Sequence, residues 1–226
     1  MPVFQLSDSI FFPPPELARE DGLLAIGGDL SPERLLMAYQ MGIFPWYSQG
    51  EPILWWSPTP RLILQPHKFH LSKRLARELK KGAFSITADT VFSEVINNCS
   101  KPRAGQSNST WITKEMRAAY CTMHERGYAH SIESWHKGEL VGGVYGISLG
   151  GVFFGESMFA TKSNASKAAL YALSQKLALW DFDFIDCQMH TSHLSSLGAE
   201  EISGPQFFST LQKSIFRSDH RGKWTL

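Results

Sequence analysis

Cysteine is scarce in this chain of 226 residues, which contains only Cys99, Cys121 and Cys187. An odd number of cysteines cannot all pair, and no two of them have the CxxC spacing. The sequence therefore indicates no disulfide framework, and we expect reduced thiols in a cytoplasmic protein.

Long apolar runs are absent as well. No stretch approaches the roughly 18 apolar residues of a membrane-spanning helix, and residues 1–12 carry no basic residue ahead of their apolar part. A signal peptide would begin with such a positive charge. We therefore expect a cytoplasmic protein that has no membrane among its partners.

An excess of charge of one sign is also lacking, because the formal net charge is +1. This argues against a surface that is basic all over, yet the charges are unevenly spread. If residues 71–81 form a helix, cations recur at three- and four-residue spacing on one face: Lys73, Arg77, Lys80 and Lys81. Such a stripe suits the backbone and unstacked end of a nucleic acid. A solvated helix face is the equally weighted alternative.

The first 60 residues or so are irregular and rich in proline and tryptophan. Their one clear helix has Ser31 as N-cap, Pro32 at its first position and Gly42 beyond its end. Near residue 62 the sequence changes from this irregular pattern to one of alternating predicted helices and strands. An apolar content of 43% suffices for a core, and 226 residues favour one main domain with a smaller appendage.

Helices and strands alternate beyond residue 62, which predicts a predominantly antiparallel mixed sheet with helices around it, an α+β domain. The expected helices are 71–81, 90–99, 113–125, 163–180 and 205–216, and the expected strands are 84–87, 129–135, 140–146, 152–159 and 184–188. A polar loop is expected at 100–109.

Two carboxylates lie in apolar surroundings that would make an outward-facing charge unusual. Asp186 belongs to the predicted strand 184–188, whose alternation would send Asp186 and Gln188 to one face and Cys187 to the other. Glu156 lies inside an apolar strand and should face a cavity or a cation, the alternative being an edge-strand charge that points outward. The order of an apolar hairpin, a polar-capped helix and a short acidic strand over residues 140–188 predicts an acyl-transfer cleft, and a perturbed carboxylate there would mark a functional site.

Two motifs suggest other chemistry but fit poorly. Residues 146–150 match the nucleophile elbow G-x-S-x-G, yet the chain continues as a strand where an elbow must enter a helix. The histidines at 124 and 130 miss the H-E-x-x-H spacing, and those at 190 and 193 lack a third ligand. We therefore expect neither a serine hydrolase nor a metal site.

Several colinear motifs together resemble one known family, the bacterial leucyl/phenylalanyl-tRNA–protein transferases. The similarity extends over nearly the whole chain and rests on the segments 27–31, 42–46, 54–58, 111–113, 129–133, 155–159, 165–167, 185–188 and 196–199. So many motifs in one order make it far more specific than any single pattern above.

The resemblance implies transfer of Leu or Phe, and less readily Met, from aminoacyl-tRNA to the N-terminal Arg or Lys of a protein, which marks that protein for N-degron proteolysis. It also implies a small domain, residues 1–62, that helps to close the aminoacyl-tRNA site. Residues 63–226 would form a GNAT-like catalytic domain, related to the acyl-CoA N-acyltransferases. No cofactor is implied, and we expect a monomer.

Site residues follow from the same resemblance, position by position. Trp46 and Trp111 would pack on the terminal adenosine, with Tyr39 and Tyr120 nearby, although buried aromatics are the alternative for this sequence pattern. The basic stripe would hold the acceptor stem. The amino-acid side-chain pocket would consist of Val144, Phe153, Met158, Leu170, Leu173 and Ile185.

The expected mechanism needs no protein nucleophile, because the aminoacyl ester is already activated and an α-amine with a pKa of roughly 7.7–8.0 is partly neutral at cytosolic pH. Positioning is the main task. Asp186 would polarise Gln188 or accept the proton of the amine, and Glu156 would attract cationic groups of the substrates. An acetyl-CoA-dependent N-acetyltransferase is the runner-up, although residues 160–166 contain no glycine for a pyrophosphate loop. A non-catalytic RNA-binding module is third.

Overall fold

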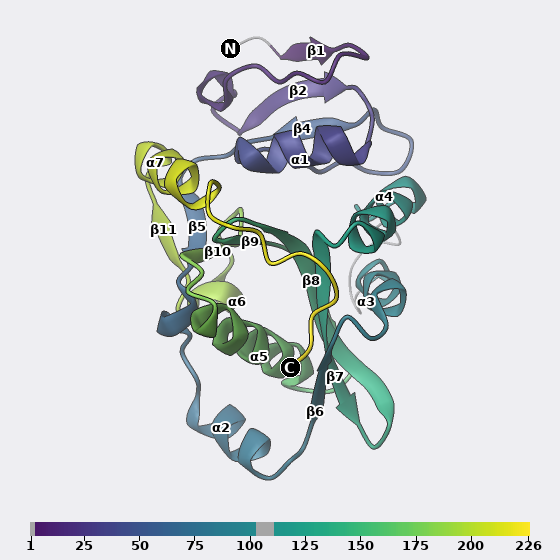
Figure 1. Ribbon diagram of the computed structural model, residues 1–226, viewed down its shortest axis with the longest axis vertical. Helices are drawn as coiled ribbons and strands as arrows, with labels where there is room; N and C mark the ends of the chain where they lie inside the picture. Colours follow the sequence, from purple (N-terminus) through teal and green to yellow (C-terminus); the bar gives the residue numbers. More distant parts are fainter. Residues whose placement is uncertain (1–2, 103–110) are drawn as a thin grey trace.

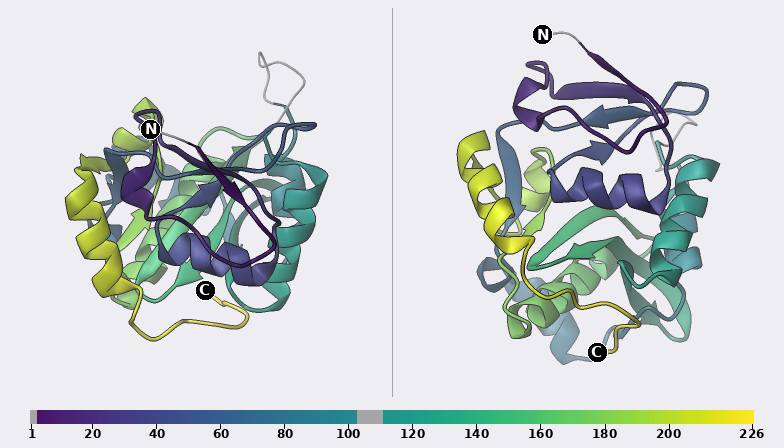
Figure 2. Two further views of the ribbon diagram at one scale, coloured as in Figure 1. Left: turned by 90° about the horizontal axis from the view of Figure 1, so that it is seen from above. Right: turned by 45° about the horizontal axis from the view of Figure 1, so that its top comes forward.

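The computed structural model of the protein describes residues 3–102 and 111–226, and these form two separate sheets (Figure 1). The N-terminal sheet has the strand order β1-β2-β4-β3, with β1 and β2 parallel. Its elements are β1 (Phe4–Leu6), a 3-10 turn (Pro15–Leu17), β2 (Leu23–Gly27), α1 (Pro32–Gln40), β3 (Phe44–Pro45) and β4 (Leu54–Trp56). Helix α1 lies on the side of this sheet that faces the larger sheet (Figure 2).

The second sheet has the order β11-β5-β10-β9-β8-β7-β6, and within it only β9 and β10 are parallel. Its strands are β5 (Arg61–Leu64), β6 (Ser85–Ala88), β7 (Ala129–His136), β8 (Glu139–Leu149), β9 (Val152–Ala160), β10 (Phe184–Asp186) and β11 (Glu200–Ile202). The predicted antiparallel mixed sheet and α+β class are therefore confirmed.

Helices cover both faces of the larger sheet. Neighbouring strand residues point to opposite faces. Phe153 packs in the core cluster of α5, whereas Phe154 packs in the cluster of α3, α4 and α7. A 3-10 turn (Pro66–Lys68) and α2 (Lys73–Lys80) precede β6. The other helices are α3 (Phe92–Cys99), α4 (Lys114–Glu125), α5 (Ala165–Leu179), α6 (Ser192–Ser195) and α7 (Gly204–Ser214).

Local capping signals explain why most predicted helices begin where expected. The hydroxyl of Ser31 accepts from the backbone N–H of Arg34, and that of Thr113 accepts from Met116. Helix α5 differs: Asn164 precedes it in a left-handed conformation without a capping hydrogen bond, and its amide donates to Glu78 instead.

One predicted strand is shorter in the structure, and one predicted loop lies mostly outside the described residues. The strand predicted at 184–188 ends at Asp186, and Gln188 adopts a left-handed conformation with φ of 57°. Most of the polar loop predicted at 100–109 lies outside the described residues, which resume at Trp111. Among the helices of the described chain, none is long and apolar enough to span a bilayer.

Candidate active site

A cavity of about 410 Å³ lies where the N-terminal sheet meets the larger one. Phe44, Pro45 and Trp46 form its N-terminal wall. The larger sheet and its surroundings supply residues 155–158 in the middle of β9, single residues of β8, β10 and α5, and most of the segment 187–194. Eight residues predicted for the site line this cavity together: Trp46, Trp111, Val144, Glu156, Met158, Leu170, Ile185 and Gln188.

The other predicted pocket residues lie behind this wall. Phe153 and Leu173 are buried in the same core cluster as Val144 and Leu170 but do not reach the cavity. Tyr39 and Tyr120 are also fully buried, and they support the site from behind through their hydroxyls. Of the two interpretations of Tyr120, contact with the ligand or burial in the core, the structure therefore shows burial.

Glu156 is the extra residue of a β-bulge. Tyr145 of β8 pairs with Ser157 and Gly146 pairs with Gly155, so that Glu156 has no partner across the ladder. A bulge re-aims a side chain out of the normal alternation. Gly146 permits it, because a Cβ there would lie 2.1 Å from the carbonyl oxygen of Phe154. The expectation that Glu156 faces a cavity is confirmed.

Two tyrosines hold the Glu156 carboxylate. Tyr39 Oη donates to Oε1 at 2.8 Å, Tyr120 Oη donates to Oε2 at 2.9 Å, and the two hydroxyls also contact each other. Burial raises the pKa of Glu156 to about 7, and the tyrosine hydrogen bonds limit the rise. A carboxyl of this kind is part ionised at neutral pH, so it can attract a cation or accept a proton.

Asp186 does not face the cavity as predicted. It is fully buried on the other face of the sheet, where Arg61 Nε donates to Oδ1 at 2.8 Å and Arg61 Nη2 donates to Oδ2 at 2.7 Å. The alternation argument was wrong because β10 ends at Asp186, so Cys187 and Gln188 both line the cavity. Burial raises the pKa of the Cys187 thiol, which keeps it protonated rather than nucleophilic.

Arg61 is the functional candidate that the sequence analysis missed. The only signal available was a general one, that a buried carboxylate needs a cationic or hydrogen-bonding partner. No local pattern says which of the 22 Lys and Arg residues it is.

The basic stripe lies apart from the cavity, on α2 at the end of the molecule farthest from the N-terminal sheet (Figure 1). Its four cations are all exposed: Lys73, Arg77 and Lys80 in the helix, and Lys81 directly after it. Leu75, on the opposite face, is buried in a small core cluster that includes Ala165 of α5. The helix predicted there is confirmed, two residues shorter at its start and one at its end.

The other motifs of the sequence are structural. Ser148 is buried within β8, which turns at residues 150–151 into β9, so there is no nucleophile elbow. His130 Nδ1 bonds Asp89 at 2.8 Å, and its ring stacks on Trp224 at a centroid distance of 3.8 Å. Within residues 3–102 and 111–226, no three His, Cys, Asp or Glu side chains are grouped to hold a metal ion.

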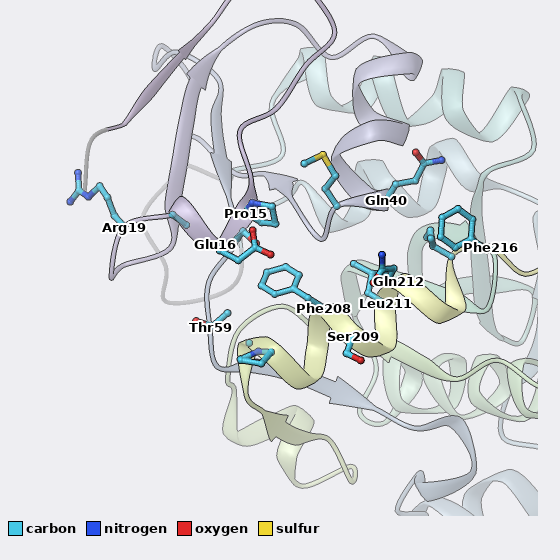
Figure 3. Close-up of a pocket in the computed structure, with 16 residues that line it drawn as sticks. Pro15, Glu16, Arg19, Gln40, Thr59, Phe208, Ser209, Leu211, Gln212 and Phe216 are labelled. Carbon is cyan, nitrogen blue, oxygen red and sulfur yellow. The ribbon is translucent and has the colours of Figure 1, made fainter.

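A larger cavity, of about 960 Å³, lies between the N-terminal domain and α7 (Figure 3). Among the described residues that line it, only Glu16 and Arg19 are titratable, and none was predicted for the site. Because a reaction site needs convergent polar groups as well as volume, the smaller cavity is the better candidate.

Comparison with known proteins identifies the family of the chain. Residues 63–212 match the family model described as leucyl/phenylalanyl-tRNA protein transferase, and residues 28–59 match the model for its N-terminal domain. The chain belongs to the leucyl/phenylalanyl-tRNA–protein transferase family. It is therefore an enzyme, an aminoacyltransferase, as the sequence analysis predicts.

Relatives carrying the family name are similar over their whole length. The one from Desulfatibacillum aliphaticivorans is 56% identical over all of this chain and 97% of its own. That from Syntrophobacter fumaroxidans is 53% identical over 99% of this chain and 96% of its own.

Similarity to solved structures is weak. A GCN5-related N-acetyltransferase from Kribbella flavida has a TM-score of 0.38 at 9% identity, covering 76% of this chain and 61% of that one. L-PGS from Bacillus licheniformis has a TM-score of 0.41 at 11% identity, covering 90% and 65%. Such low scores do not establish a shared fold, so the GNAT-like character of residues 63–226 stays a prediction.

Proposed function

We propose that the enzyme transfers Leu or Phe, and less readily Met, from aminoacyl-tRNA to the N-terminal Arg or Lys of acceptor proteins, and so marks them for N-degron proteolysis. The observation that carries the proposal is the composition of the 410 Å³ cavity. It combines an apolar wall, two tryptophans, one carboxylate and one amide, which is what an apolar aminoacyl group on an adenosine requires.

The apolar wall is the proposed site of the amino-acid side chain. Val144, Met158, Leu170 and Ile185 line one part of the cavity without a charged group among them. A pocket of this kind favours Leu, Phe and Met by burial, and it distinguishes them by shape at about 1–3 kcal/mol per methylene. Rejection of Val and Ile would come from the same shape.

Trp46 and Trp111 are the proposed stacking surfaces for the terminal adenosine. Trp46 is 36% exposed, and its ring leans against Trp56 with centroids 5.6 Å apart. Stacking of a base on an aromatic ring is tolerant of sequence and contributes about 1–3 kcal/mol. The N-terminal domain, residues 1–62, would close the site mainly through Trp46 and its neighbours.

The reaction is attack of an amine on an ester, so the leaving group is the ribose hydroxyl of the tRNA and one proton must leave the amine. Glu156, with a pKa of about 7, is placed to attract the ammonium group of a substrate. Gln188, which lines the cavity, would orient the attacking amine or the carbonyl. The remaining contribution is positioning, which can supply about 7–11 kcal/mol of the barrier.

The exposed cations of α2 are the proposed contact for the acceptor stem. They lie away from the cavity, as a stem that continues beyond the terminal nucleotides requires. Cytoplasmic location and a monomeric state stay predictions.

The test is direct. The protein is incubated with labelled Leu-tRNA or Phe-tRNA and a peptide that begins with Arg, and in parallel with a matched peptide that begins with Glu. We expect label on the Arg peptide alone. Labelled acetyl-CoA serves as the third arm. Acetylation of the peptide without transfer from tRNA would replace the proposal by an acetyltransferase function.

A further inference from the structure

Arg61 occupies the boundary between the two sheets and is almost completely buried. Its guanidinium makes a two-point contact with Asp186, and Nη2 also donates to the carbonyl of Gly42 at 3.0 Å. The guanidinium carbon lies 4.5 Å from the ring centroid of Phe207 and 5.1 Å from that of Phe44. Its third nitrogen, Nη1, has no hydrogen-bond partner in the described chain, so Asp186 and Gly42 alone fix its hydrogen bonding.

Asp186 connects Arg61 to a residue that lines the cavity. Its Oδ1 accepts the backbone N–H of Gln188 at 2.9 Å, in addition to Nε of Arg61. Gln188 has the left-handed backbone, φ 57°, that non-glycine residues rarely adopt. The hydrogen bond from its N–H stabilises this conformation, which turns the Gln188 side chain to the cavity beside Cys187.

Gly42 links the same guanidinium to the opposite wall. It follows α1 with φ of 72° and leads within four residues to Phe44, Pro45 and Trp46, which line the cavity. The residue must be glycine, since a Cβ there would lie 2.7 Å from the Phe207 ring. One buried side chain thus contacts the backbone of both walls, directly at Gly42 and through Asp186 at Gln188.

We propose that Arg61 is a positioning residue for the transfer reaction. Through its ion pair with Asp186 it fixes the backbone conformation of Gln188, and through its hydrogen bond to Gly42 it aligns Gln188 with the cavity wall that contains Trp46. The expected effect of Arg61 on the rate of transfer rests on the proposed function. Asp186 is then no proton acceptor, because both of its oxygens already accept from Arg61, Oδ1 accepts a second bond, and the side chain is buried away from the cavity.

Arg61→Lys tests the alignment with charge retained. A single ammonium cannot reproduce the two-point contact with Asp186 together with the bond to Gly42. We expect the single-turnover rate at saturating Leu-tRNA to fall by about 10²-fold, since a misplacement of about 1 Å has this effect. Affinity for the tRNA should stay within a factor of about two, so the loss appears in kcat rather than KM.

Arg34→Lys is the matched control. Arg34 is also fully buried, and it too holds backbone carbonyls, those of Ser7, Asp8 and Ser9, but far from the cavity. The variant Arg34→Lys should lower the melting temperature and leave the single-turnover rate of the folded enzyme unchanged. A rate loss of equal size in both variants would make Arg61 merely structural.

A second variant separates folding from alignment. Arg61→Met/Asp186→Leu replaces the ion pair by apolar groups of similar volume, an exchange that often leaves stability intact. It should fold and still transfer slowly, because the acceptor for the Gln188 N–H is gone. Asp186→Asn should lower the rate at every pH without recovery at alkaline pH, whereas loss of a general base would be relieved as the amine deprotonates.

Hydrogen exchange of the Gln188 amide gives a readout that does not depend on activity. Its protection should be lost in Arg61→Lys and in the apolar double variant but kept in Arg34→Lys. Full protection in Arg61→Lys, or transfer at the wild-type rate in either Arg61 variant, would overturn the proposal. Absence of transfer by the wild type would refute the proposed function, and the exchange result would still decide the positioning of Gln188.

Discussion

The hydroxyl of Tyr120 on α4 donates to Oε2 of Glu156 on β9 at 2.9 Å, from a fully buried tyrosine to a half-buried carboxylate that lines the cavity. The bond stabilises the ionised carboxylate, while burial opposes ionisation more strongly. Glu156 therefore carries its charge at a free-energy cost to the folded state, and that cost depends on pH.

The first prediction concerns Glu156→Gln. Folding raises the pKa of Glu156 from 4.5 to about 7, so between these values the folded protein binds more protons than the unfolded chain. Wild-type stability should fall as pH rises through this window, by at most about 3 kcal/mol. Glutamine does not titrate, so the stability of Glu156→Gln should not decrease in this way. Its melting temperature relative to wild type should rise from pH 5 to pH 8.

Glu139→Gln is the control, because Glu139 is an exposed glutamate at the start of β8. Its melting temperature should follow the wild-type trend at every pH. If Glu156→Gln also follows that trend, the carboxylate keeps its ordinary pKa in the folded protein. Transfer activity of Glu156→Gln should fall in either case, because the charge that attracts the substrate ammonium is removed.

The second prediction concerns Trp46→Ala. Loss of a stacking surface for the adenosine should weaken use of aminoacyl-tRNA by about 1–3 kcal/mol, measured as kcat/KM for the donor. The fold should tolerate the change, since the ring is 36% exposed. Trp135→Ala, at a half-buried tryptophan on β7 that bonds Thr87, is the control and should leave donor use unchanged. An equal effect in both variants would argue against stacking.

Much of the fold could be predicted because its signals are local. Ser31 and Thr113 each cap a helix within three residues, and the apolar strands β8 and β9 are adjacent in the sequence and pair with each other. The cavity wall of Val144, Met158, Leu170 and Ile185 was found through resemblance, and the structure brings these side chains together.

The directions in which Asp186 and Glu156 point both depend on long-range contacts, and only the prediction for Asp186 was wrong. Asp186 pairs with Arg61 across 125 positions, and this pairing decides which way Asp186 points. Glu156 faces the cavity through a bulge whose register is set by β8, not by its own strand. The sequence pattern of a single strand contains neither fact.

The third prediction concerns the basic helix. Reversing two exposed cations in Lys73→Glu/Lys80→Glu should weaken binding of tRNA and flatten the dependence of log K on log salt, by about 0.7–0.9 for each phosphate that the helix no longer neutralises. Binding is measured by titration between 50 and 200 mM salt. Lys213→Glu, an exposed reversal on α7, should leave the slope unchanged. An unaltered slope in the double variant would leave α2 as a solvated surface.

The last prediction separates the wall of the pocket from the core behind it. Leu170 and Leu173 lie on the same helix and are both buried, but only Leu170 lines the cavity. Each Leu→Ala change should cost about 2–5 kcal/mol of stability.

Only Leu170→Ala enlarges the cavity, so it alone should raise kcat/KM for Phe-tRNA relative to Leu-tRNA, by a factor within the 10–200 that about 1–3 kcal/mol allows. The comparison is made at a temperature where both variants are folded, with the two donors competing for one Arg-initiated peptide. A shift of the ratio in Leu173→Ala as large as that in Leu170→Ala would mean that general loosening of α5, and not the shape of the wall, selects the amino acid.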